Sequence, residues 1–72
     1  MEHKPELVQV LRSLLIDVFT AQYEGANHQK LARAFGYADG YMRAVLEAGI
    51  VSRQELLDIV QEERRRTVRE AA

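Results

Sequence analysis

The chain has 72 residues, of which 47% are hydrophobic and 29% are charged, and its formal net charge is −1. This composition excludes a disordered chain, because enough apolar surface is present to offset the entropy lost on folding, and the length predicts a single domain over residues 1–72. The chain has no cysteine, which excludes disulfides, and it has neither a secretion signal nor an apolar run of roughly 18 residues, which predicts a cytoplasmic protein that does not cross a membrane.

The first expected element is a helix from Pro5 to about Tyr23. Proline suits the first turn of a helix, and Gly25 is expected to end it. At about 100° per residue, all its apolar side chains except that of Ile16 spread over half of the helix circumference, which is wider than a small core requires. The surplus predicts a dimer or partner interface, for which the candidates are Val8, Leu15, Ile16 and Phe19. Short helices that wrap this helix on several sides would explain the same breadth.

Residues 28–48 have the spacing of a helix-turn-helix. Asn27 is expected to cap a short helix, which Gly36 ends because glycine readily takes the positive φ of a helix end. Asp39 is expected to cap a second helix, and Gly49 marks the end of that helix. The pattern therefore predicts two short helices that cross at a steep angle.

A further helix is expected to begin at Ser52, where the sequence Ser52-Arg53-Gln54-Glu55 forms a capping box. The apolar pattern of this helix stops after Val60, and residues 61–67 (QEERRRT) are polar on every side. Their acid-before-base spacing supports an exposed helix, so the polar tail, residues 61–72, is expected to protrude. The predicted fold is all-α, with four to five short helices, a helix-turn-helix core and an exposed, charged C-terminal helix.

Several features between Arg12 and Val60 carry a family resemblance, and these are Gln29, Leu31-Ala32, Phe35-Gly36-Tyr37, Met42, Val45, Glu47-Ala48-Gly49, Leu56-Leu57 and Ile59. In these features the chain resembles the small bacterial and phage repressors of the Cro/C1 helix-turn-helix type. The resemblance implies a four- or five-helix domain that is usually dimeric on DNA. It also implies that the helix beginning near residue 39 lies in the major groove and reads bases.

By this analogy Arg43, with Tyr41 beside it, is the first candidate for a base or phosphate contact. Lys30 and Arg33 are candidates for backbone phosphates, and Gln29 for a phosphate at a helix N-terminus. Ordinary solvated side chains on a helical hairpin would give the same pattern. The charge argues mildly against nucleic acid, because residues 26–50 hold only three basic side chains against two acidic ones.

Two functions follow from these features. The first is a DNA-binding transcriptional regulator that binds duplex DNA as a homodimer. The second is a helical adaptor or inhibitor that binds another protein through the first helix or through the charged C-terminal helix. The arginines of that last helix, Arg64, Arg65, Arg66 and Arg69, would contact phosphates or an acidic protein, or pair with neighbouring glutamates. We expect no enzyme, cofactor, metal or small-molecule substrate, because no nucleophile motif or metal-ligand spacing is present.

Overall fold

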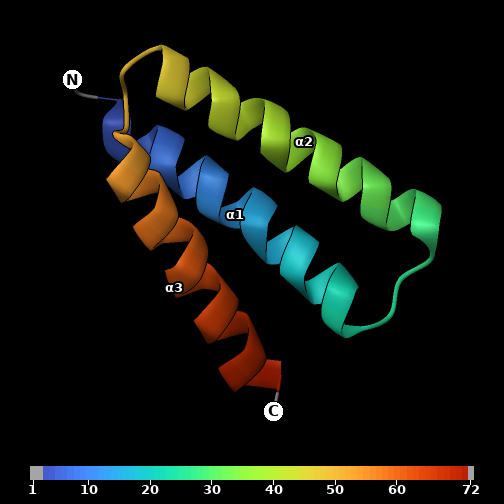
Figure 1. Ribbon diagram of the computed structural model, residues 1–72. Coiled ribbons are helices and arrows are strands. Elements are labelled where there is room, and N and C mark those ends of the chain that lie inside the picture. The colour runs from blue at the N-terminus through green and yellow to red at the C-terminus, as the bar shows by residue number, and fades with distance from the viewer. Residues whose placement is uncertain (1–2, 72) are drawn as a thin grey trace.

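The computed structural model describes residues 3–71, which form three helices: α1 (Lys4–Tyr23), α2 (His28–Glu47) and α3 (Arg53–Ala71). Helix α1 packs against both of the others. Helices α2 and α3 lie close only near the loop that joins them, and they diverge from there along α1 (Figure 1). The all-α prediction is confirmed for the described residues, whereas the prediction of four to five helices is wrong.

Local sequence signals set the starts of α2 and α3 and the ends of α1 and α2 as predicted. The Asn27 side chain caps α2 by accepting a 2.9 Å hydrogen bond from the backbone N–H of Lys30. In the capping box of α3, the Ser52 hydroxyl accepts from the Glu55 N–H at 3.1 Å, and the Glu55 carboxylate accepts from the Ser52 N–H at 2.9 Å. Gly25 and Gly49 follow α1 and α2 with φ of +69° and +72°, a backbone conformation that glycine adopts at little cost.

The predicted turn of the helix-turn-helix is absent, because α2 runs without a break through Gly36. Gly36 has no positive φ. Asp39 caps nothing, and its carboxylate instead pairs with Arg43 one turn later at 3.1 Å. The reason is packing, because a continuous apolar stripe on α2 faces the core. The free energy gained by burying this stripe is larger than the cost of about 1 kcal/mol for a glycine inside a helix. The buried and half-buried members of this stripe are Leu31, Ala34, Ala38, Tyr41, Met42 and Val45.

The core lies where α1 meets its two neighbours. Most of its buried side chains come from α1, joined by Ala38 from α2 and Ile59 from α3, and those of α1 are Leu11, Leu15, Val18 and Phe19. The broad apolar face of α1 is therefore explained inside one chain, since α2 covers one part of it and α3 another.

The prediction that the polar tail protrudes is wrong for part of that segment. Residues 61–71 continue α3, and the Glu63 side chain is completely buried, with 0% of its surface exposed. Thr67 is half-buried, and its hydroxyl donates a 2.9 Å hydrogen bond to the carbonyl of Glu63. The segment packs because Arg12 on α1 supplies a charged partner for the buried carboxylate.

Candidate interaction surfaces

The residues predicted to contact DNA all lie on α2, but they do not all lie on one exposed face of it. Gln29, Arg33 and Arg43 are exposed and fall within about 80° of the helix circumference. Lys30 is further round and lines a groove between α1 and α2 with Arg33. Tyr41 is half-buried, and its hydroxyl donates to the backbone carbonyl of Leu7 at 2.9 Å. Tyr41 therefore ties α2 to α1.

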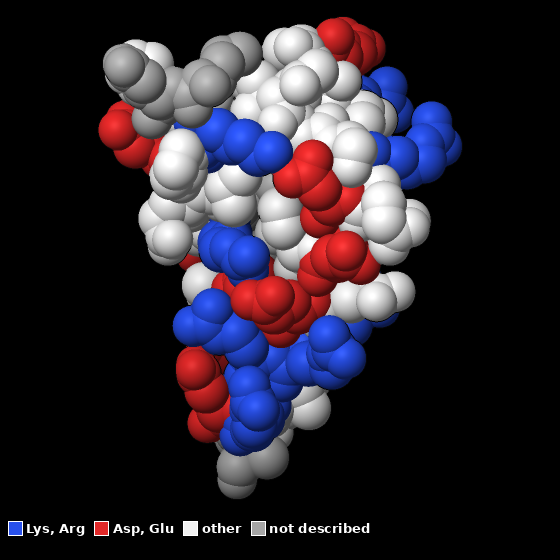
Figure 2. All heavy atoms as spheres, turned by 90° about the vertical axis from the view of Figure 1, so that its left-hand side faces the viewer, with Lys and Arg blue, Asp and Glu red and all other residues white. Residues whose placement is uncertain are grey.

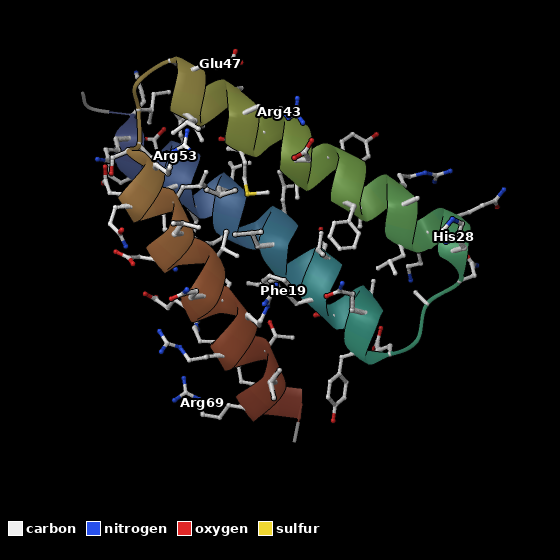
Figure 3. The ribbon with its side chains drawn as sticks, viewed as in Figure 1. Phe19, His28, Arg43, Glu47, Arg53 and Arg69 are labelled. Atoms are coloured by element: carbon white, nitrogen blue, oxygen red, sulfur yellow. The ribbon has the colours of Figure 1, made fainter. Side chains whose placement is uncertain are left out.

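An exposed stripe of α2, which we call the outer face, spans about 120° of the helix. Its members are all exposed, and they are Arg33, Gly36, Tyr37, Gly40, Arg43, Ala44 and Glu47. Arg43 and Glu47 point away from α1 on this side (Figure 3). A Cβ added at Gly36 or Gly40 would meet no atom within 4 Å, so packing within the chain does not require glycine at either position. The Tyr37 side chain is a large apolar group that is 67% exposed.

The residues predicted to form a dimer or partner interface are divided between the core and the surface. Leu15 and Phe19 are buried, with exposed fractions of only 3% and 7%, and Val8 is half-buried against the core. Ile16 is 39% exposed on the other side of α1. Of these four side chains, Ile16 is therefore exposed, Val8 is partly exposed, and Leu15 and Phe19 are not accessible to a partner.

The sequence did not identify Glu63 as a site residue. Its Oε2 atom accepts hydrogen bonds from Arg12 at 2.6 Å and from Arg66 at 3.2 Å, and Arg12 also donates to Glu62 at 3.0 Å. A signal was present in the spacing, because residue 63 lies seven after Leu56 and continues the buried stripe of α3. The position was not identified as buried because a glutamate is not expected in a buried stripe.

The arginines of α3 are used in different ways. Arg64 lies with its guanidinium 5.1 Å from the centre of the Phe19 ring, and Arg66 pairs with Glu63. Arg65 and Arg69 form no ion pair within residues 3–71. Figure 2 shows basic and acidic side chains interleaved over one side of the molecule, with the basic ones denser towards the C-terminal end of α3. This pattern describes a mixed surface and not a continuous basic one.

A second ion pair joins the starts of α1 and α3. Lys4 Nζ donates to Glu55 Oε2 at 2.8 Å. This hydrogen bond from Lys4, followed by that from the Ser52 backbone, lowers the pKa of the Glu55 carboxyl below its ordinary value of 4.5. The same carboxylate therefore caps α3 and anchors it to α1.

Within the described part of the chain, no three His, Cys, Asp or Glu side chains are grouped so that they would hold a metal ion. Over the same residues, no helix has the length and apolar character needed to cross a membrane. Comparisons of the chain with protein families, with curated proteins and with solved structures found no match. The chemistry of the surfaces is therefore the basis for a functional assignment.

Proposed function

We propose that the chain is a non-enzymatic, helical protein-interaction module that assembles as a homodimer, with the outer face of α2 joining the two copies. The observation that carries the proposal is the symmetry of this face about Gly40. Gly36 and Ala44 each lie four residues from Gly40, and Arg33 and Glu47 each lie seven residues from it. A face with this order is complementary to itself when two copies lie antiparallel.

Antiparallel pairing follows from simple geometry. If two α2 helices cross at Gly40 about a two-fold axis, each residue before Gly40 faces the residue equally far after it in the partner. Arg33 then faces the partner's Glu47, and the symmetry forms this charge pair twice. Tyr37 and Arg43, each three residues from Gly40, also face one another, which allows the guanidinium to stack on the ring.

The two glycines support the same arrangement. A glycine inside a helix costs about 1 kcal/mol relative to alanine, and α2 carries two of them, Gly36 and Gly40, on its exposed side. Neither is required by contacts within the chain. Small residues four apart let two helix backbones approach closely. Close contact between two α2 helices would therefore explain the glycines, which contacts within one chain do not explain.

Charge reversal tests the proposal without disturbing the core, because Arg33 and Glu47 are both exposed. Sedimentation equilibrium of the unaltered chain is expected to give twice the mass of one chain at high concentration. Arg33→Glu places like charges opposite each other and should shift the equilibrium to monomer, and so should Glu47→Arg. The double variant Arg33→Glu with Glu47→Arg restores opposite charges and should recover the dimer. Arg65→Glu on α3 is the matched control and should change nothing.

Two results would contradict the homodimer. One is a monomer at every concentration up to about 1 mM, where even a weak specific dimer with a dissociation constant in this range is substantially populated. The other is a dimer that both single reversals leave unchanged, because the contact would then lie elsewhere on the chain.

DNA binding is a second candidate, and the shared position of Gln29, Arg33 and Arg43 on one exposed face favours it. A regulator of this kind would bind random duplex DNA in a fluorescence anisotropy assay at low salt and lose affinity steeply at about 0.2 M salt. Arg43→Ala should then weaken binding by about 1 to 3 kcal/mol if Arg43 contacts a base. Glu47→Arg separates the two candidates, because it should strengthen DNA binding and weaken the dimer.

A further inference from the structure

A strip of exposed side chains runs along one side of α3. Leu57 and Val68 are each exposed over about half of their surface, and Gln61 and Arg64 between them are exposed as well. These four residues, which we call the seam, follow one another at intervals of four, three and four. This is the spacing at which a helix presents one side to a second helix. At 1.5 Å per residue, the seam is about 17 Å long.

The C-terminal end of the seam borders a hollow between α1 and α3. The hollow has a volume of about 260 Å³ and is lined by Phe19, Gln22 and Tyr23 of α1 and by Arg64 and Val68 of α3. Pockets that hold drug-sized ligands are larger, at about 300 to 1,000 Å³. A hollow of this size, with two aromatic rings and a valine in its lining, suits one apolar side chain of a larger partner.

The C-terminal half of α3 has a local excess of positive charge. Residues 64–69 contain four arginines and no acidic residue, and Figure 2 shows the basic side chains denser towards this end of the helix. Arg66 pairs with Glu63, whereas Arg65 and Arg69 form no ion pair within residues 3–71. These last two guanidinium groups are exposed and lie one helical turn apart, so they are available to carboxylates of a partner.

The N-terminal half of the seam has acidic neighbours instead. Asp58 and Glu62 lie on the same side of α3 as Arg65 and Arg69, because all four fall within about 60° of the helix circumference. Negative charge on a partner is therefore attracted along one half of the seam and repelled along the other. We propose that the seam binds an amphipathic helix of another protein, with an apolar side chain in the hollow and acidic side chains only at the end that lies on Arg65 and Arg69.

This arrangement favours a protein over other anionic partners. Nucleic acids and anionic membranes present negative charge along their whole contact surface, and Asp58 and Glu62 would repel it. The apolar lining of the hollow gives no hydrogen bond to a phosphate beyond that of one arginine. The inference rests on the proposed function only in that the chain is an interaction module. The seam is on α3 and the outer face is on α2, so the two surfaces are tested separately.

Fluorescence anisotropy with a designed peptide tests the seam in the full chain. The probe is a fluorescein-labelled peptide of about 18 residues, which is long enough to follow the seam as a helix. It carries leucines at intervals of three and four residues, glutamates in its N-terminal half, where they also stabilise a helix, and alanine and glutamine elsewhere. We expect saturable binding with a dissociation constant below about 100 μM. Lysines in place of the glutamates should weaken binding about tenfold or more, and glutamines in place of the leucines should abolish it.

Matched variants separate the seam from general charge attraction. Arg65→Gln with Arg69→Gln removes two positive charges from exposed side chains and should weaken peptide binding about fivefold or more. Gln9→Glu with Ser13→Glu changes the net charge by the same amount at exposed positions of α1, and it should leave the affinity unchanged. Val68→Gln places an amide beside the hollow and should weaken binding about threefold or more.

Four results would overturn the proposal. The first is binding that does not saturate or that has a dissociation constant above about 1 mM. The second is equal affinity for the glutamate and lysine peptides. The third is an equal loss of affinity in the two charge variants. The fourth is tighter binding of a poly-dT oligonucleotide of about 18 nucleotides, or of phosphatidylserine vesicles, than of the acidic peptide.

Sedimentation equilibrium distinguishes a failure of the seam from a failure of the homodimer. Arg65→Gln with Arg69→Gln leaves the outer face of α2 unchanged, so this variant should still sediment as a dimer while its affinity for the peptide falls. A dimer with no affinity for the peptide would overturn the seam alone, and a monomer that binds the peptide would overturn the homodimer alone.

Discussion

Replacing Gly36 by alanine tests whether α2 is one continuous helix, because the substitution should raise the free energy of unfolding if residue 36 lies inside a helix and lower it if residue 36 forms a turn. Gly36 lies inside α2 without a positive φ, and a Cβ there meets no atom within 4 Å, so the substitution carries no steric cost. Alanine is favoured over glycine in a helix by about 0.5 to 1 kcal/mol, and the free energy of unfolding should rise by that amount. In a domain of this size the melting temperature should rise by about 2 to 8 °C.

Circular dichroism measures this change, in thermal and urea unfolding at concentrations low enough for the chain to be monomeric. Gly25→Ala and Gly49→Ala are matched controls, because φ at these glycines is +69° and +72°. Alanine there should lower the stability by about 1 kcal/mol or more. If Gly36→Ala also lowers the melting temperature, residue 36 is a turn and the continuous α2 helix is refuted.

Three further substitutions test individual contacts by urea denaturation. Glu63→Ala leaves two arginines without their shared carboxylate and should cost about 2 to 3 kcal/mol, and a loss below about 1 kcal/mol would contradict a structural role for the buried ion pair. Tyr41→Phe removes the hydroxyl that joins α2 to α1 and should cost about 1 kcal/mol, whereas an unchanged midpoint would mean that this hydrogen bond contributes nothing. The hydrogen bond from Lys4 lowers the pKa of Glu55, so the unfolded chain binds more protons as the pH falls below the ordinary value of 4.5. The stability that Glu55 contributes is complete above that value and is lost below it, and Glu55→Gln should therefore flatten the decline in unfolding free energy as the pH falls below 4.5. Equal declines in the two proteins would exclude this linkage.

The helix ends were predictable because their signals are local. Asn27 and Ser52 each bond to a backbone N–H three residues later, and Gly25 and Gly49 each take a positive φ. Such interactions depend on a few neighbouring residues, so a single sequence contains them.

The continuity of α2 was less predictable, because glycine ends some helices and lies inside others. The deciding information is the apolar stripe, which keeps a spacing of three and four residues from Leu31 through Ala38 to Val45 without a shift at Gly36. A turn at Gly36 would have broken that register. The spacing of the apolar residues therefore indicates a continuous helix, whereas the resemblance to a repressor motif led to the prediction that Gly36 ends a helix.

The candidate sites depended on tertiary structure. Glu63 is a glutamate in a polar stretch, and its partner Arg12 lies 51 residues away along the chain, so only the packing of α3 on α1 brings them together. Leu15 and Phe19 have the character of interface residues as well as of core residues. Their burial depends on how many neighbours α1 has, and local patterns do not determine that number.

An engineered cysteine at Gly40 tests the proposed homodimer most directly, because the chain has no cysteine of its own. Antiparallel α2 helices that cross at Gly40 bring the two residues within the Cα separation of about 4 to 7 Å that a disulfide requires. At Gly36 the two copies would be about 12 Å apart along the helix axes, since eight residues separate positions 36 and 44. Mild oxidation should therefore link Gly40→Cys into covalent dimers far faster than Gly36→Cys. Equal rates for the two variants, or no covalent dimer from Gly40→Cys, would contradict assembly through the outer face of α2.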